Sequence, residues 1–314
     1  MTHPAAAGLV SLGNSECNLD LTVGCGQVFH WTRDGAGYVG LIADSPVYVE
    51  QRKGRLMVST GAEEIARRYF ALDHPLPAIY ASFPEDPAMA AALEFCRGMR
   101  IVRQPLWECT ATFITSSMKQ VAHIAQISHT LRRRFGKRVE WNRQLLPVSP
   151  PQIAAVPMLP ILPISLPPDL FTYPTPEALA ALKEEDLRAC ALGYRARHLL
   201  GAARAVASGE VDLDAVARMD DDEARAELCR LPGVGVKVAN CALLFAFERL
   251  RAFPIDVWIE RVLRETYFPK TRKITAKKLG EFSAKYFGEY GGYAQQYLFH
   301  HARKTRARVR TQLT

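Results

Sequence analysis

The residues with the clearest chemical potential are a lysine and an aspartate nineteen positions apart, Lys237 and Asp256. Lys237 is predicted to lie in the first turn of a helix, where the helix macrodipole disfavours a cation. A partly desolvated lysine at such a place keeps more free amine, which can attack an electrophilic carbon. Asp256 follows Pro254 at a predicted helix start, where its carboxylate could cap the helix or assist an amine nucleophile. A phosphate-binding lysine and a plain capping aspartate are the alternatives.

The lysine follows a glycine-rich turn within the segment LPGVGVKVANC. One helix is predicted to end at Leu231, because the next residue is a proline. Gly233 and Gly235 permit a tight turn, and a second, apolar helix is predicted to begin near Val236. A turn without side chains lets backbone N–H groups approach a phosphate at the positive end of the following helix. The pattern favours a helix-hairpin-helix over an ordinary corner between two helices.

Other elements are needed to hold this hairpin. Residues 19–60 contain the short β-branched or aromatic runs LDLTV, QVFHW, YVGLIA, VYVEQ and LMVST, which predict an antiparallel meander. From about residue 62 the pattern is helical, and apolar residues at helical spacing over 108–135 predict one buried helix face. The sequence predicts an α+β protein with a sheet domain with flanking helices over 1–104 and a helical domain over 105–314.

A proline-rich stretch interrupts the helical part. Residues 147–176 hold ten of the 20 prolines, which forbids a continuous helix and predicts an irregular connection. Helical patterning resumes at Pro176. A plain linker is favoured over a proline-rich partner motif.

Charge is unevenly distributed along the 314 residues. Residues 270–314 hold 11 basic and 2 acidic residues, a net of +9 out of a total of +8, so the remainder nets to −1. A basic block beside a neutral body indicates a polyanionic partner, with nucleic acid ahead of an anionic membrane and a solubilising tail as the alternative. With 48% hydrophobic and 23% charged residues, disorder, collagen and a disulfide miniprotein are excluded.

The cysteines predict neither disulfides nor a metal site. There are 7, never spaced as C-x-x-C, which is typical of reduced thiols and offers no zinc or iron–sulfur ligand set. No positively charged n-region and no uninterrupted apolar stretch of membrane length is seen. We therefore expect an intracellular protein without a membrane partner, in the cytoplasm or nucleoid of a bacterium or the nucleus of a eukaryote.

Five ordered blocks run from about residue 19 to residue 300: CGQVFHW, VRQPLWECTATFITSS, LGYRAR, LPGVGVKVANC and GGYAQQYLF. Together they resemble the helix-hairpin-helix DNA glycosylase superfamily, and specifically its 8-oxoguanine DNA glycosylase/AP lyase family. The resemblance implies a monomeric base-excision repair enzyme without a cofactor, which acts on double-stranded DNA containing oxidised guanine. Such an enzyme rotates the damaged nucleotide out of the duplex into a pocket.

The resemblance also implies catalytic roles. Lys237 matches the lysine that attacks C1′, displaces the base and forms a Schiff base, which permits strand cleavage by β-elimination. Asp256 matches the carboxylate that assists this step. Gly233, Gly235 and Val236 match the hairpin that holds a phosphate.

A base pocket is implied in the same way. Gly26 matches the glycine whose carbonyl accepts a hydrogen bond from N7–H, a donor that oxidised guanine has and guanine lacks. Phe299 and Cys241 match the residues that sandwich the flipped base, and Gln295 matches the one that reads its Watson–Crick edge. Phe245 occupies a position that could line the pocket. Without the resemblance, Cys241 and Phe299 would be interpreted as core residues.

The expected contacts to the opposite strand depart from the family pattern. Tyr194 and Arg195 match the wedge and the reader of the orphaned base. Met118 and His123 stand where members that require cytosine carry Asn and Arg, so we expect a relaxed opposite-base preference. Trp258 replaces a histidine that faces phosphate in eukaryotic-like members.

Two rival functions are weighed. A monofunctional glycosylase for adenine or alkylated bases would lack the hairpin lysine, and many relatives outside the family carry a C-terminal four-cysteine cluster, whereas no cysteine follows Cys241 here. A noncatalytic helix-hairpin-helix DNA-binding protein would use Lys237 only for phosphate and would not need Gly26, Gln295 and Phe299 together.

Overall fold

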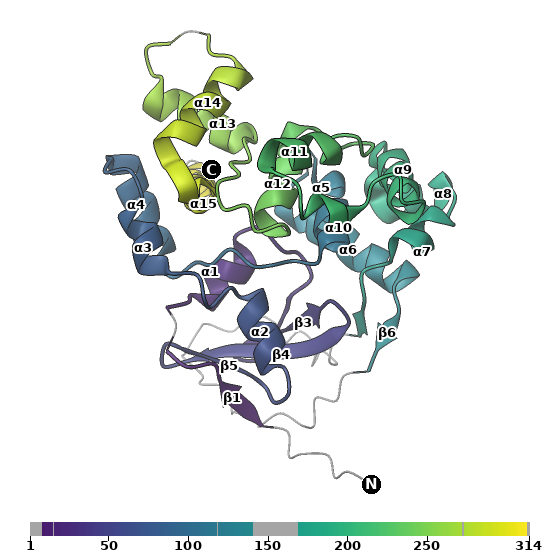
Figure 1. Cartoon of the computed structure of the whole chain (residues 1–314). Helices are drawn as coiled ribbons and strands as arrows, with labels where there is room; N and C mark the ends of the chain where they lie inside the picture. Colours follow the sequence, from purple (N-terminus) through teal and green to yellow (C-terminus); the bar gives the residue numbers. More distant parts are fainter. Residues whose placement is uncertain (1–7, 15, 118, 141–168, 272, 313–314) are drawn as a thin grey trace.

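The N-terminal part of the chain forms an antiparallel sheet, which lies below the helices in Figure 1. The computed structural model describes residues 8–14, 16–117, 119–140, 169–271 and 273–312, of which 306–312 are described for their backbone only. The five strands lie in the order β1-β5-β4-β3-β2. Their bounds are β1 (Leu9–Ser11), β2 (Thr32–Asp34), β3 (Gly37–Ile42), β4 (Ser45–Arg52) and β5 (Arg55–Ser59). The predicted sheet is confirmed, with each paired strand antiparallel to its neighbours.

The run LDLTV, predicted as a strand, is instead the helix α1 (Leu19–Gly24), and that prediction was wrong. Asn18 precedes it in an extended conformation, and its side-chain oxygen accepts a hydrogen bond from the Leu21 N–H at 3.1 Å. This cap stabilises the first turn, and Leu19 and Val23 of the run are buried in the core cluster that includes the sheet. QVFHW was also predicted as a strand, but β2 begins only after Trp31. Capping and tertiary burial decided the conformation here, against β-propensity.

Helices make up the rest of the fold and confirm the α+β class. Those in the first third are α2 (Glu63–Tyr69), α3 (Leu76–Ala81) and α4 (Pro87–Cys96). The next are α5 (Leu106–Ser116), α6 (Val121–Phe135), α7 (Pro176–Ala180), α8 (Glu184–Leu187), η2 (Arg188–Leu192) and α9 (Arg195–Ala207). The last are α10 (Leu213–Val216), α11 (Asp221–Leu228), α12 (Val236–Phe245), α13 (Val257–Tyr267), α14 (Ala276–Phe287), η3 (Gly288–Tyr290) and α15 (Gly291–Gln312). In Figure 1, α4 lies beside the C-terminal helix α15, and the two pack together.

The stretch 108–135 contains two helices rather than one continuous face. α5 ends where Ser117 adopts an extended conformation, and α6 begins at Val121. Glu108 of α5 and Arg132 of α6 form a buried ion pair, which holds the two helices together. The break between the two helices brings Lys119 to the edge of a cavity that Lys237 and Asp256 also line.

The predicted helix-hairpin-helix is confirmed as α11 and α12. α11 ends at Leu228, three residues before the predicted position, and α12 begins at Val236 as predicted. Gly233 has φ +82°, a left-handed conformation, and a Cβ there would lie 2.7 Å from the Cβ of His198. Only glycine fits this turn without strain, because both its conformation and its contact with α9 exclude a side chain.

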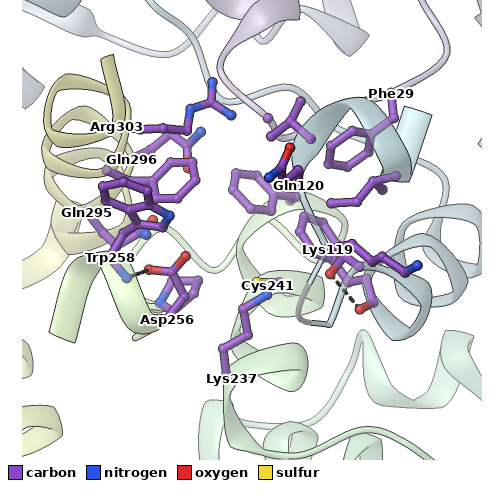
Figure 2. Close-up of a pocket in the computed structure, with 18 of the residues that line it drawn as sticks. Phe29, Lys119, Gln120, Lys237, Cys241, Asp256, Trp258, Gln295, Gln296 and Arg303 are labelled. Atoms are coloured by element: carbon purple, nitrogen blue, oxygen red, sulfur yellow. Dashed lines mark hydrogen bonds between the residues drawn. The ribbon is translucent and has the colours of Figure 1, made fainter. Parts of the chain in front are cut away.

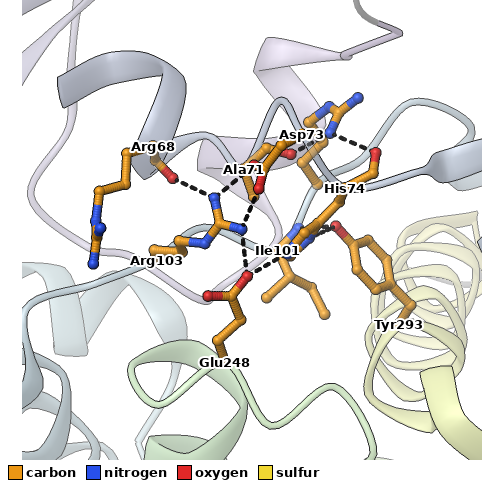
Figure 3. Close-up of polar contacts among 9 residues, drawn as sticks. Arg68, Ala71, Asp73, His74, Ile101, Arg103, Glu248 and Tyr293 are labelled. Carbon is orange, nitrogen blue, oxygen red and sulfur yellow. Dashed lines mark hydrogen bonds and ion pairs between the residues drawn. The ribbon is translucent and has the colours of Figure 1, made fainter. Parts of the chain in front are cut away.

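A polar network joins the sheet-bearing part to the helical part (Figure 3). The His74 ring contacts the Tyr293 hydroxyl of α15 at 2.8 Å and the Glu248 carboxylate of the α12–α13 connection at 2.7 Å. Arg103 donates to Asp73 at 2.6 Å and also pairs with Glu248. The network connects the loop before α3 to the segment that leads toward Asp256.

Part of the proline-rich connection predicted over 147–176 lies outside the described residues, up to residue 168. After it, β7 (Leu170–Phe171) pairs with β6 (Arg138–Val139), and α7 begins at Pro176 as predicted. None of the helices in the described part of the chain is both long and apolar enough to cross a membrane.

Candidate active site

One cavity of about 530 Å³ lies between α5, α6, α12, α13 and α15. This volume is in the range of small-molecule sites in proteins. Figure 2 shows Asp256, Trp258, Gln295, Gln296 and Arg303 along one side, with Phe29 and Lys119 opposite and Lys237 and Cys241 below. The cavity therefore gathers residues from both ends of the chain around the predicted nucleophile.

Lys237 lies in the first turn of α12 and lines this cavity, as predicted. Its ammonium nitrogen lies 5.4 Å from the centroid of the Phe113 ring. The Cys241 thiol lies one helical turn further along α12, and burial raises the pKa of this thiol while the Lys237 ammonium opposes the shift. A thiol kept neutral by burial is a poor nucleophile, so Cys241 does not compete with the predicted role of Lys237.

Asp256 caps a helix and also lines the cavity. Its Oδ1 accepts hydrogen bonds from the N–H groups of Trp258 at 3.0 Å and Ile259 at 2.8 Å, so it caps α13. Its carboxylate also lines the cavity and faces the same space as Lys237 (Figure 2). Burial raises the pKa of Asp256, and the two backbone donors and the Lys237 ammonium oppose this shift. The cap fixes the carboxylate in place without occupying Oδ2, because both capping bonds end on Oδ1.

Gly26 lines the cavity beside Arg303 in a left-handed conformation with φ +95°. A Cβ there would lie 3.2 Å from Nη1 of Arg303 and 3.6 Å from Cε1 of Phe299. Both the conformation and the close approach disfavour any side chain. The glycine therefore exposes its backbone to the cavity beside Phe299, where the resemblance expects base contact.

Gln295 and Phe299 project from adjacent turns of α15 into the cavity. Gln295 is 4% exposed, and its Oε1 is buried without a hydrogen-bond partner among the described residues. The neighbouring Gln296 differs, because its amide donates to the Cys25 carbonyl at 3.4 Å. A buried amide oxygen without a partner costs free energy, which is typical of a group reserved for a ligand.

Two further predicted residues also line the cavity. Phe245 is 3% exposed and stacks on Phe113, with ring centroids 5.4 Å apart and an interplanar angle of 11°. Trp258 lines the wall beside Asp256, and the Arg261 guanidinium lies 5.8 Å from the centroid of its ring. The aromatic wall matches the needs of a planar ligand.

The residues predicted to contact DNA outside the pocket are only partly on the surface. Val236 is 62% exposed and Tyr194 is 46% exposed, which is unusual for large apolar side chains. His123 is exposed on α6 and does not line the cavity. Arg195 is only 5% exposed and donates through Nε to the Ser117 carbonyl at 2.8 Å. Met118 lies outside the described residues.

The glycines of the hairpin lie on the same exposed surface. Gly233 and Gly235 are both exposed, and Gly235 caps α12 with no side-chain hydrogen bond. The first N–H groups of α12 therefore point to solvent without a side-chain cap, which suits an anion.

Several lining residues were not predicted from the sequence. They are Phe29, Phe113, Ser116, Lys119, Gln120, Val121, Ala122, Ile124, Pro254, Gln296 and Arg303. Phe29 belongs to the CGQVFHW block, and Arg303 lies four residues after Phe299, so helical spacing could have identified it. Lys119 and Gln120 depend on the break between α5 and α6, which the periodicity did not reveal.

Comparison with known families covers nearly the whole chain. Residues 9–110 match the N-terminal domain of 8-oxoguanine DNA glycosylase. Residues 112–287 match the HhH-GPD superfamily base excision DNA repair proteins, which is more than half of the chain.

Individual proteins are similar over most of their length. A probable N-glycosylase/DNA lyase of Methanothermobacter thermautotrophicus is 31% identical over 72% of this chain and 70% of its own length. The N-glycosylase/DNA lyase OGG1 of Arabidopsis thaliana is 28% identical over 92% of this chain and 78% of its own length. The solved structure of MBOgg1 in complex with a low-affinity DNA ligand superposes with a TM-score of 0.83 at 29% identity, covering 97% of this chain and 98% of that one. With both family matches in sequence order and the lysine and aspartate brought to one cavity, the chain belongs to the 8-oxoguanine DNA glycosylase family of the HhH-GPD superfamily.

Proposed function

We propose that this protein is a bifunctional DNA glycosylase and AP lyase that excises 8-oxoguanine from duplex DNA. The observation that carries the proposal is the shared cavity of Lys237, Asp256 and the unpartnered amide of Gln295. The N-glycosylase/DNA lyases that are similar over most of the chain support the same activity. We expect a monomer that needs no cofactor.

In the proposed reaction, the free amine of Lys237 attacks C1′ of the flipped nucleotide. A C1′–N bond forms, the C1′–N9 bond breaks, and its electron pair leaves with the base. The Asp256 carboxylate stabilises the positive charge that develops on the sugar, a role favoured by its partly desolvated place in the same cavity as the amine. The resulting amine loses a proton, its electron pair forms the C1′=N bond of the Schiff base as the C1′–O4′ bond breaks, and O4′ takes up a proton to become a hydroxyl. Loss of a proton from C2′ then expels the 3′ phosphate.

Base recognition is proposed for other residues that line the same cavity. The carbonyl of Gly26 would accept the N7–H of the oxidised base, whereas guanine would place its N7 acceptor there and be rejected. Gln295 would pair with the Watson–Crick edge, and Phe299 and Cys241 would enclose the two faces of the base. Their positions around one cavity support this assignment.

We also propose a relaxed preference for the opposite base. Met118 and His123 replace the polar residues of members that require cytosine. Arg195, the remaining expected reader, has its guanidinium engaged by the Ser117 carbonyl. A guanidinium that already donates to the backbone has fewer donors left for a base, so discrimination should fall.

The test is sodium borohydride trapping on duplexes that carry 8-oxoguanine opposite each of the four bases, with undamaged guanine as the control. A covalent adduct that requires both the lesion and Lys237 is expected, and Lys237→Gln should abolish it while changing duplex affinity modestly. DNA binding by the parent without any adduct would refute the lysine-nucleophile mechanism. Excision opposite cytosine alone would refute the relaxed preference.

A further inference from the structure

Arg303 is a cationic residue in the cavity that the proposed reaction has not used. It lies on α15 one helical turn after Phe299, and its guanidinium carbon lies 5.3 Å from the centroid of that ring. Its Nη2 donates to the Gly24 carbonyl at 3.1 Å and contacts Nδ1 of His300 at 3.4 Å. The aromatic ring below and the backbone carbonyl beside it hold the guanidinium in one orientation.

The remaining donors of this guanidinium are unoccupied. Every hydrogen bond of Arg303 within the described part of the chain uses Nη2, so Nη1 and Nε have no partner there. No carboxylate among the described residues forms an ion pair with it. Burial lowers the pKa of Arg303, with Cys25 and then Asp256 opposing the shift, which indicates a partly desolvated cation on the cavity wall. Free N–H donors of a cation on a cavity wall favour an electron-rich ligand atom.

Geometry places these free donors beside Gly26. Nη1 would lie 3.2 Å from a Cβ at Gly26, so it is in van der Waals reach of that backbone. In 8-oxoguanine, N7 and the C8=O8 carbonyl are adjacent on the five-membered ring. A base whose N7–H meets the Gly26 carbonyl therefore brings O8 to the same wall as Nη1.

We propose that Arg303 donates an N–H hydrogen bond to O8 of the flipped base and stabilises the base as it leaves. This inference rests on the proposed function. When Lys237 attacks C1′, the electron pair of the C1′–N9 bond moves onto the base, and the charge spreads from N9 through C8 to O8. A guanidinium at O8 binds this anion more strongly than it binds the neutral base, so it stabilises the transition state and accelerates the bond-breaking step.

The chemistry distinguishes Arg303 from a residue that only attracts DNA. A general electrostatic contact would act alike on every DNA substrate. A contact to O8 would act only while the base is present, and it would not contribute at an abasic site, where the base has already left. The informative quantity is the ratio of the rate of 8-oxoguanine release to the rate of strand cleavage at a preformed abasic site.

The experiment measures both rates in single turnovers with excess enzyme. Arg303→Met keeps an unbranched side chain over Phe299 and removes the charge and the donors. The ratio is expected to fall about 10- to 100-fold, the range for losing a hydrogen bond to a charged group. Arg303→Lys keeps the cation without the planar fork and should restore the ratio in part. Thermal unfolding and affinity for a duplex with a tetrahydrofuran abasic analogue report whether each variant is folded.

The matched control is Lys304→Met, which removes one positive charge from an exposed neighbour on the same helix. This control should leave the ratio unchanged. An unchanged ratio in Arg303→Met, or an equal fall of both rates, would overturn the inference. Failure of the parent to release 8-oxoguanine at all would instead refute the proposed function, and this inference with it.

Discussion

The unpartnered side-chain oxygen of Gln295 predicts that one substitution will raise the stability of the protein and lower its activity. Gln295→Met replaces the amide by an apolar side chain of similar length. The Oε1 of Gln295 is buried with no partner among the described residues, and such an orphaned acceptor costs about 1–3 kcal/mol. Removing it should raise the free energy of unfolding of the DNA-free protein by about 1 kcal/mol or more. The midpoint of thermal unfolding should rise by about 2 °C for each kcal/mol.

The same substitution should impair catalysis. Methionine cannot pair with the Watson–Crick edge of the base, so polar groups of the base would be buried without partners. A cost of about 1–3 kcal/mol corresponds to a loss of roughly 5- to 150-fold in 8-oxoguanine excision. Urea or thermal unfolding without DNA measures the first effect, and single-turnover excision measures the second.

Gln296→Met is the matched control, because the neighbouring amide does have a partner. Its hydrogen bond to the Cys25 carbonyl would be lost, so stability should fall by about 1 kcal/mol rather than rise. The reasoning about Gln295 would be refuted if Gln295→Met lowered stability as its neighbour does. Excision at the parental rate by Gln295→Met would refute its role in reading the base.

Three further predictions concern the carboxylates and the pocket glycine. Burial raises the pKa of Asp256, so its ionised form destabilises the folded protein above that pKa. Asp256→Asn keeps the cap and should raise the midpoint of thermal unfolding at pH 7 but not at pH 3. The same variant should lower excision at pH 7 by about 100-fold or more, and an unchanged excision rate would contradict the catalytic role. Gly26→Ala forces a side chain into φ +95° and toward Arg303 and Phe299, so it should cost about 1–2 kcal/mol of stability and reduce binding of the lesion duplex more than of an abasic duplex; equal affinity losses would argue against a base contact at Gly26. The hydrogen bond from Arg103 lowers the pKa of Asp73 to about 2, so this ion pair stabilises the fold above about pH 4 and ceases to do so as pH falls through 2. Asp73→Asn should lower the free energy of unfolding at pH 7 by less than about 1 kcal/mol, because the carboxylate is largely exposed. An equal loss of stability at pH 2 would exclude the ion pair as the cause.

Local sequence was sufficient to predict the hairpin and the positions of Lys237 and Asp256 at helix starts. A turn that contains Pro232 and two glycines can adopt few conformations. Lys237 and Asp256 each lie at the start of a helix, as the local sequence predicts. The cap that Asp256 forms was also predictable, because a capping carboxylate is held close to the backbone whatever packs around it. The class of fold followed from the change of period, from two in the sheet to that of a helix.

Predictions from local propensity failed where long-range contacts decided the conformation. LDLTV has the composition of a strand, but the Asn18 cap and burial of its apolar residues made it helical. The helical period over 108–135 continued across a break, because the turn at Ser117 changes the chain direction without changing the spacing of apolar residues.

The sequence by itself determined which residues could react, because a lysine after a glycine turn and a capping aspartate are positioned by their local sequence. Only the tertiary structure decided what surrounds them. Gly26 and Arg303 are 277 positions apart, yet they form one wall of the cavity, and the missing partner of Gln295 becomes evident only when its neighbours are in place. The physical reason is that desolvation and hydrogen-bond satisfaction depend on every group packed around an atom, and those groups come from distant parts of the chain.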